Sequence, residues 1–125
     1  MLSNRLKVLL FQIRTAILQL KEWNNNVQSS DDYYCSPDGM KNLAASCMLI
    51  EAIGESIKQI DKITEGNLLA KRPEIPWKDV IGIRKHIAHG YFDIDGDMVF
   101  DVVKNDLDSL LEAIEYFIEN LTVEK

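Results

Sequence analysis

Apolar residues recur at the spacing of one helix face in three long stretches of the chain. The first stretch ends at Trp23, where Asn24-Asn25-Asn26 follows. Asparagine competes poorly for helix interiors and suits helix ends, so the triplet predicts a stop. The second stretch follows Ser36-Pro37-Asp38, a sequence typical of an N-cap and an acidic first turn. The apolar positions are Leu6, Leu9, Leu10, Ile13, Ile17, Leu20 and Trp23; Leu43, Cys47, Ile50, Ile53, Ile57 and Ile60; and Val99, Val102, Val103, Leu107, Leu110, Leu111, Ile114, Phe117, Ile118 and Leu121.

A shorter helix is predicted between the second and third stretches. Pro76 suits a first helical turn, so the helix is expected from Trp77 to about His89, with Gly90 as its stop. The turn that follows, residues 93–97, offers Asp95 or Asp97 as the cap of the last helix. No long segment alternates as a strand would. The pattern predicts an all-α, antiparallel bundle of four to five helices, formed by residues 1–125 as a single domain.

The composition fits such a bundle. The chain has 125 residues, of which 46% are apolar, with only six glycines and three prolines. These values exclude disordered and collagen-like classes.

No apolar run approaches the roughly 20 residues that cross a bilayer, and basic residues interrupt the N-terminal stretch where a signal peptide would need an apolar core. Two cysteines, Cys35 and Cys47, lack the paired spacing of a zinc site. We therefore expect a cytoplasmic protein with no membrane association and reduced thiols.

Charge is distributed unevenly along the chain. The formal net charge is −6, which argues against a general polyanion binder. Residues 92–125 hold ten acidic and two basic side chains, whereas residues 70–91 hold five basic and two acidic ones. Both segments are compatible with ordinary solvated faces, so the basic one bears on function only if it also carries residues suited to chemistry.

Three patterns that suggest metal sites fail on their spacing. The aspartates from Asp93 begin like a calcium loop, but Met98 and Lys104 occupy the required glycine and glutamate positions. His86 and His89 lie three residues apart on the predicted helix and supply only two ligands. Neither histidine lies three residues after a glutamate, as a di-metal bundle requires. The sequence thus predicts no metal and no cofactor. Glu51 and Glu55, one turn apart, are expected to form a solvated or salt-bridged face, and the alternative is that Glu55 faces a basic partner across the bundle.

The segment from Arg84 to Tyr91 gathers a guanidinium, an ammonium, two imidazoles and a phenol. Arginine binds phosphate through its planar fork, and histidine exchanges protons near neutral pH. On an ideal helix Arg84 and His89 would differ by about 140° and about 7.5 Å of rise, so they would line one lip of a groove. A second copy related by a two-fold axis would supply the other lip. Such a groove suits general acid–base cleavage of RNA by its own 2′-hydroxyl. Spacing alone favours a simpler interpretation, in which Arg84 pairs with a carboxylate and His89 caps a helix end.

Two segments resemble the HepT-like family of HEPN-domain proteins: IPWKDVIGIRKHIAHGYFDID, from Ile75 to Asp95, and IEAIGESIKQI, from Ile50 to Ile60. The resemblance implies a dimeric HEPN-like fold and a metal-independent endoribonuclease toxin that acts as a homodimer beside a nucleotidyltransferase antitoxin. It further implies that Arg84 and His89 cleave RNA in a cleft between protomers. Tyr91 is then the position where the antitoxin attaches an adenylyl group and silences the toxin.

One position departs from the family pattern. Lys85 follows the motif arginine, where the family often has asparagine. Lysine donates hydrogen bonds and adds charge but cannot accept one, so Lys85, like the additional His86, is a candidate for RNA contact only. Two other functions remain open: a non-catalytic module that binds a nucleotide or a transferase partner, and a helical dimerisation adaptor.

Overall fold

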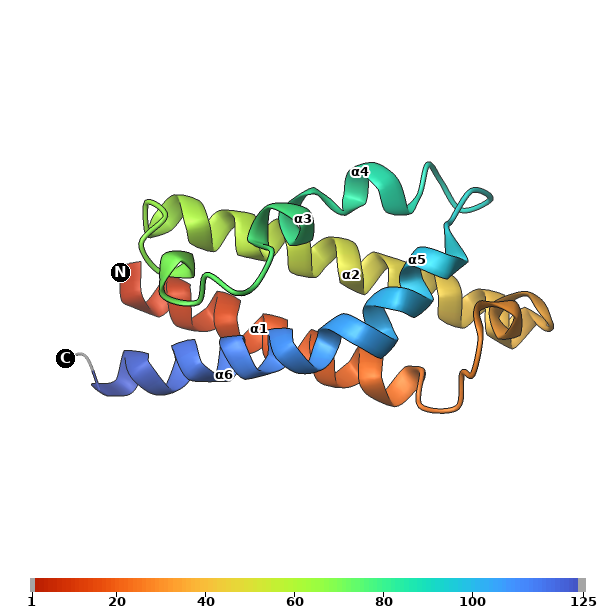
Figure 1. The fold of residues 1–125 in the computed structure, drawn as a ribbon, viewed down its shortest axis with the longest axis horizontal. Helices are drawn as coiled ribbons and strands as arrows, with labels where there is room; N and C mark the ends of the chain where they lie inside the picture. Colours follow the sequence, from red (N-terminus) through yellow and green to blue (C-terminus); the bar gives the residue numbers. More distant parts are fainter. Residues whose placement is uncertain (1, 124–125) are drawn as a thin grey trace.

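The computed structural model describes residues 2–123, and its long helices form three rods that lie side by side (Figure 1). The first two are α1 (Leu2–Trp23) and α2 (Pro37–Ile63). The third is a continuous run of α5 (Gly96–Asp101), the π-helical turn η3 (Val102–Asp106) and α6 (Leu107–Val123). α1 packs against both α2 and α6 and runs antiparallel to them. The predicted all-α bundle is confirmed.

Four short helical segments connect the rods: the 3-10 turns η1 (Ser30–Tyr34) and η2 (Leu69–Lys71), and the helices α3 (Trp77–Gly82) and α4 (Arg84–Ile87). α3 and α4 both pack on α2. Between residues 2 and 123 the structure contains no β-strand and only one isolated antiparallel bridge, between Ala88 and Ile94. No helix in the described range is both long enough and apolar enough to cross a bilayer.

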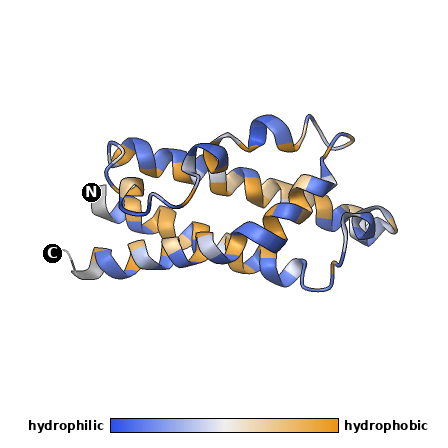
Figure 2. Cartoon of the chain, viewed as in Figure 1, coloured by the Kyte–Doolittle hydropathy of each residue, from blue (hydrophilic) through white to orange (hydrophobic). Residues whose placement is uncertain are grey.

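The core lies between the three rods, where their apolar faces meet (Figure 2). It uses every apolar position that the sequence pattern predicts on α2 and all of those on α1 except Trp23, which is 39% exposed. The predicted positions on the third rod are buried in the core or partly buried against it. Burial removes apolar area from water and is the main favourable contribution to the fold. The largest fully buried side chains are Tyr33, Phe117, Leu10, Ile13, Ile17, Leu20, Leu43, Ile57, Ile60, Ile87, Leu107 and Ile114.

The predicted helix signals at two N-termini are confirmed. The Ser36 hydroxyl accepts a hydrogen bond from the backbone N–H of Gly39 at 3.0 Å, and Pro37 is the first residue of α2. Of the two candidate caps for the last rod, Asp95 is the one used: its carboxylate accepts from the N–H of Met98 at 3.0 Å. Asp97 instead accepts a short hydrogen bond from the Ser30 hydroxyl.

The stop after Trp23 is also confirmed, and a buried polar network explains its stability. Asn24 is 1% exposed, and its side-chain amide donates to Ser46 Oγ at 3.0 Å. Its oxygen accepts from the Tyr33 hydroxyl at 2.8 Å and from Asn42 at 3.2 Å. Burial raises the pKa of Tyr33 to about 12, so the phenol stays a donor. Every polar atom of the amide is therefore paired, which offsets the cost of burying it.

The expected helix from Trp77 to His89 is wrong in its second half. The structure divides it at Ile83 into α3 and α4, and the chain becomes extended at Ala88, with φ −160° and ψ 148°. The reason is tertiary: the N–H of Asp95 donates to the Ile87 carbonyl at 2.8 Å, and Ala88 pairs with Ile94. The Ile87 carbonyl and the His89 N–H, which donates to the Asp93 carbonyl, are thus bonded outside the helix, so His89 lies outside any helix.

Candidate functional site

The segment that carries the candidate residues is anchored at its start by Trp77. The Trp77 indole donates to the carbonyl of Arg72 at 2.9 Å, and its ring stacks on Phe117 of α6, with ring centroids 6.0 Å apart. A second anchor is the buried Ile87, which is 0% exposed at the end of α4. The residues between these two anchors, among them Arg84, are thus held against the bundle.

Gly54, inside α2, is the point where α3 packs closely on α2. A Cβ placed on Gly54 would lie 2.8 Å from the carbonyl oxygen of Val80 in α3. Real side-chain carbons do not approach backbone oxygen so closely, so α3 can pack at this distance only because residue 54 is glycine. The contact fixes how near α3, and the α4 that follows it, lies to α2.

Glu55, the next residue on α2, pairs with Arg84 at the start of α4. Arg84 Nη1 lies 3.1 Å from Glu55 Oε2, with the two side chains 62% and 43% exposed. An ion pair this exposed contributes little to stability, about 0–1 kcal/mol. It orients the guanidinium, whose other N–H groups make no hydrogen bond to residues 2–123. The pair agrees with the salt-bridged face that the sequence favours for Glu55, and with the carboxylate partner that spacing alone favours for Arg84.

Arg84 and Glu55 lie in a shallow groove between α2 and α4. Its remaining lining residues are Met48, Glu51, Ala52 and Ala88. Ala88 directly precedes His89, so the groove leads from the guanidinium to the chain that carries the imidazole. No hydrogen bond or ion pair joins Arg84 to His89 within the described part of the chain.

His89 begins a tight turn. Its backbone N–H donates to the Asp93 carbonyl at 2.9 Å, and the N–H of Asp93 donates back to the Gly90 carbonyl at 3.1 Å. Gly90 has φ +128°, a conformation that other residues rarely adopt. The sequence expectation that helix geometry orients His89 is therefore wrong, since this turn holds the residue. The imidazole itself is exposed and makes no side-chain hydrogen bond to any residue between 2 and 123.

Tyr91 lies in the same turn, 54% exposed. Its ring meets Phe92 edge to face, with centroids 5.1 Å apart and an interplanar angle of 79°. Lys85 and His86 are exposed on α4, which is largely hydrophilic in Figure 2. Sequence reasoning placed these candidates on one segment but did not single out Phe92. An aromatic residue beside Tyr91 in a turn is the signal that could have found it.

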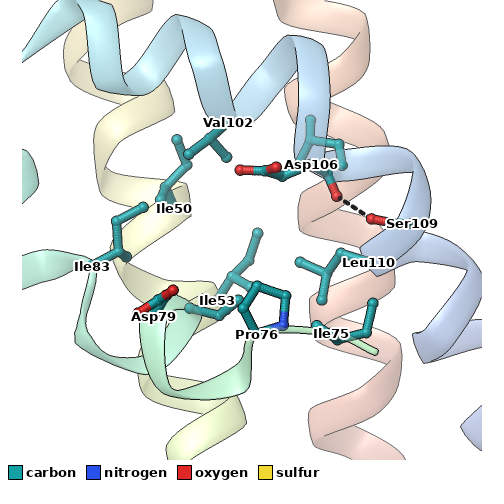
Figure 3. Close-up of a pocket in the computed structure, with 12 residues that line it drawn as sticks. Ile50, Ile53, Ile75, Pro76, Asp79, Ile83, Val102, Asp106, Ser109 and Leu110 are labelled. Carbon is teal, nitrogen blue, oxygen red and sulfur yellow. Dashed lines mark hydrogen bonds between the residues drawn. The ribbon is translucent and has the colours of Figure 1, made fainter. Parts of the chain in front are cut away.

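A separate, mostly apolar pocket lies where α2, α3 and the third rod meet (Figure 3). Its volume is about 310 Å³, and it shares Val80 and Ile83 with the segment leading to Arg84. The carboxylate of Asp106 points into it from the end of the π-helical turn. Among residues 2–123, no cluster of three or more His, Cys, Asp and Glu side chains is placed to hold a metal ion.

The π-helical turn interrupts the predicted last helix and changes the electrostatics of Asp106. Residues five apart are neighbours in a π-helix, so the turn brings Asp106 close to Asp101. Partial burial, and then the charge of Asp101, raise the pKa of Asp106 above its ordinary value. The folded protein therefore binds this proton more tightly than the unfolded chain, and the carboxylate destabilises the fold once it ionises.

We expect Asp106→Asn to stabilise the protein at pH 7, by less than about 1 kcal/mol because solvent screens the charges. The gain should shrink as the pH falls through the raised pKa of Asp106, since the parent carboxyl is then protonated and neutral. Thermal unfolding followed by circular dichroism at pH 7 and pH 3 measures the difference. Asp93→Asn, at an exposed turn carboxylate, is the control; an equal gain there at pH 7 would contradict the assignment to Asp106.

The comparison with known families matches most of the chain. The sequence model of the family described as "Ribonuclease HepT-like" matches residues 13–117, which span from the middle of α1 to α6. The match includes Glu55, Arg84 and the turn with His89 and Tyr91. No solved structure matches the chain significantly.

Curated relatives come from Methanocaldococcus jannaschii, Thermococcus cleftensis and Caldanaerobacter subterraneus. "Probable ribonuclease HepT" of Thermococcus cleftensis is 30% identical over 103 residues, 82% of this chain and 86% of the relative. "Putative RNase MJ1216" of Methanocaldococcus jannaschii is 24% identical over 116 residues, 93% of this chain and 89% of the relative. "Putative RNase MJ0127" of the same organism is 29% identical over 72 residues, 58% of this chain. In three relatives from this organism the matched part spans only 56–59% of their length. Because the family model matches residues 13–117 and a 30% identical relative is matched over 86% of its length, the chain belongs to the Ribonuclease HepT-like family.

Proposed function

We propose that this chain is a metal-independent endoribonuclease toxin of a toxin–antitoxin pair, with residues 1–125 acting as one domain in the cytoplasm. The observation that carries the proposal is the arrangement on one exposed segment: Arg84 oriented by Glu55, and His89 held in a turn with an unpaired imidazole. Membership of a family described as ribonuclease-like supports the same activity.

The chemistry needs a phosphate-binding group and proton exchange. The RNA 2′-hydroxyl loses its proton and attacks the adjacent phosphorus, and the P–O5′ bond breaks as the 5′ oxygen takes up a proton. The products are a 2′,3′-cyclic phosphate and a free 5′-hydroxyl. Arg84 suits the phosphate, because Glu55 engages Nη1 and leaves other N–H donors for the phosphate oxygens. His89 suits the proton transfers, because its ring is exposed and free to exchange a proton.

The same chemistry favours a homodimer. Removing one proton while delivering another is best done by two groups, and one turn supplies a single imidazole at His89. A two-fold arrangement places a second Arg84 and His89 across the groove, so the cleft between protomers would hold both. Lys85 and His86, exposed on α4, would then add positive charge along the RNA backbone.

Tyr91 supplies a way to silence the enzyme. Its half-exposed phenol lies two residues after His89, within reach of a nucleotidyltransferase antitoxin. An adenylyl group on Tyr91 would place a bulky anion beside the positive groups that bind the RNA phosphate. Both its volume and its charge would then exclude the substrate.

A second function is favoured by one observation, the ion pair between Arg84 and Glu55. If that pair were only structural, the module would bind a nucleotide or a transferase partner without cutting RNA. The two functions differ in whether the unmodified protein cleaves RNA.

The test is RNA cleavage by purified protein in excess chelator, after intact-mass analysis shows that Tyr91 carries no adduct. We expect cleavage of single-stranded RNA with 2′,3′-cyclic phosphate ends, and no cleavage of the same sequence as DNA, which lacks the 2′-hydroxyl. A protein adenylylated at Tyr91 is the matched control and should be inactive. Failure of unmodified protein to cut a varied set of RNAs would favour the binding module.

A further inference from the structure

Phe92 is the most exposed large apolar side chain in the described part of the molecule, at 97%. Burying a phenylalanine side chain is worth about 1.5–3 kcal/mol, and the fold gains none of this at residue 92. In the other aromatic pairs of the described residues, Trp77 and Tyr116 each pack on Phe117, which is 1% exposed. The fold therefore does not account for an aromatic residue at this position.

The backbone of the turn fixes where Phe92 lies. The bond from the Asp93 N–H to the Gly90 carbonyl makes Tyr91 and Phe92 the two central residues of a four-residue turn. The bond from the His89 N–H to the Asp93 carbonyl closes its base. Phe92 is thus held by the same two hydrogen bonds that hold His89, three residues away.

The side chain of Phe92 has one neighbouring ring. The edge-to-face contact with Tyr91 supports the Phe92 ring from one side, and the 97% exposure leaves its surface open to solvent. Nucleic acid bases stack on such rings with little dependence on sequence, because every base has a π-face. Stacking also fixes the position of an unpaired base without hydrogen bonds to its edges.

Charge decides which part of an RNA strand fits here. Arg84, Lys85 and His86 lie on the α4 side of the turn and suit the phosphates, whereas Asp93, next to Phe92, repels them. A neutral base meets no such repulsion. A strand whose phosphate lies at Arg84 and His89 would therefore place a base, not its backbone, on Phe92.

We infer that Phe92 is a stacking platform for an unpaired base of the RNA substrate, beside the phosphate that is cut. The inference rests on the proposed ribonuclease function and adds a positioning residue to it. It also predicts a preference for single-stranded over double-stranded RNA, because a base must leave its helix to stack on the ring.

The experiment compares Phe92→Ala, Phe92→Leu and Phe92→Trp with the parent. Removing one base stack should raise the KM for single-stranded RNA about 5- to 150-fold in Phe92→Ala and change kcat little. Phe92→Leu keeps apolar volume but loses the π-face, so it should resemble Phe92→Ala. Phe92→Trp should retain the parent KM, and its fluorescence should change when RNA is added. Leu18→Ala, at an exposed apolar residue of α1, is the control and should match the parent.

Each outcome separates the platform from its alternatives. If Phe92→Ala and Phe92→Leu both kept the KM of the parent protein, Phe92 would not be a stacking platform, and the proposed ribonuclease function would be unaffected. Loss of dimer in Phe92→Ala by analytical ultracentrifugation, with rescue by Phe92→Leu, would overturn it in favour of a protein contact. If the parent cuts no RNA, the proposed function fails. In that case fluorescence anisotropy with a labelled single-stranded RNA oligonucleotide tests base stacking at Phe92 separately from cleavage. If the parent and Phe92→Ala bound the oligonucleotide with equal affinity, the stacking platform would be ruled out.

Discussion

Replacing His89 with alanine is expected to lower kcat for RNA cleavage by about 10²- to 10⁴-fold, the range for loss of a group that transfers a proton. The fold should not change, because the imidazole is exposed and makes no side-chain hydrogen bond to the residues that the structure describes. His89 contributes to the turn only through its backbone N–H, which an alanine at this position also has. Single-turnover cleavage in chelator, with a matched thermal unfolding curve, measures both effects.

His86→Ala is the matched comparison for this result. It removes the same kind of side chain from an exposed position of α4, three residues earlier. As a candidate RNA contact, His86 should affect KM and leave kcat within about threefold of the parent, because an interaction made equally in ground and transition states changes binding alone. Equal loss of kcat in both variants would mean that positive charge, and not proton transfer at His89, limits the rate. Full activity in His89→Ala would contradict the mechanism.

The sequence predicts the bundle well because its signals are local. Helix faces with a 3.6-residue period, the Ser36 cap and the asparagine stop after Trp23 all act within a few residues of where they occur. The contact at Gly54 was also predictable, because a glycine inside a long helix costs stability unless something needs the space.

The conformation around His89 was not predictable in the same way. The intrinsic pattern of residues 77–89 favours one helix, but the bond from the Asp95 N–H to the Ile87 carbonyl ends α4 early. That bond depends on where α5 begins, which the bundle decides. The π-helical turn at Val102–Asp106 has no local signal either, since its apolar positions fit an ordinary helix. At Ile87 the pairing with Asp95 overrides the local preference for a helix, and both places border the candidate site or the adjoining pocket.

The sequence and the helix packing determine different properties of the candidate site. The residue types of the motif can be read from the sequence, but their geometry depends on the packing of α3 on α2. Arg84 follows α3 by two residues and meets Glu55, which follows Gly54 directly. A substitution at Gly54 should therefore move the Arg84 guanidinium indirectly, through the position of α3.

Gly54→Ala is expected to destabilise the protein and to lower cleavage together. The new Cβ would lie 2.8 Å from the Val80 carbonyl oxygen, and this backbone atom cannot rotate away as a side chain would. α3 must move, although Trp77 ties it to α6. Such overpacking costs about 1–3 kcal/mol, against a gain of about 1 kcal/mol from alanine's higher helix propensity. Urea unfolding measures the net loss, and the displaced Arg84 should lower kcat/KM at temperatures where the variant is still folded.

Gly82→Ala tests whether this effect comes from the contact or from the loss of a glycine. Gly82 ends α3, and a Cβ there would meet no atom within 4 Å. Restricting the unfolded chain should then stabilise the protein by about 0.4–1 kcal/mol, with unchanged cleavage. Two identical substitutions in touching helices are thus expected to change stability in opposite directions. If both variants changed stability by the same amount and sign, the spacing of α3 and α2 would not depend on Gly54, and the geometry of Arg84 would have to be set elsewhere.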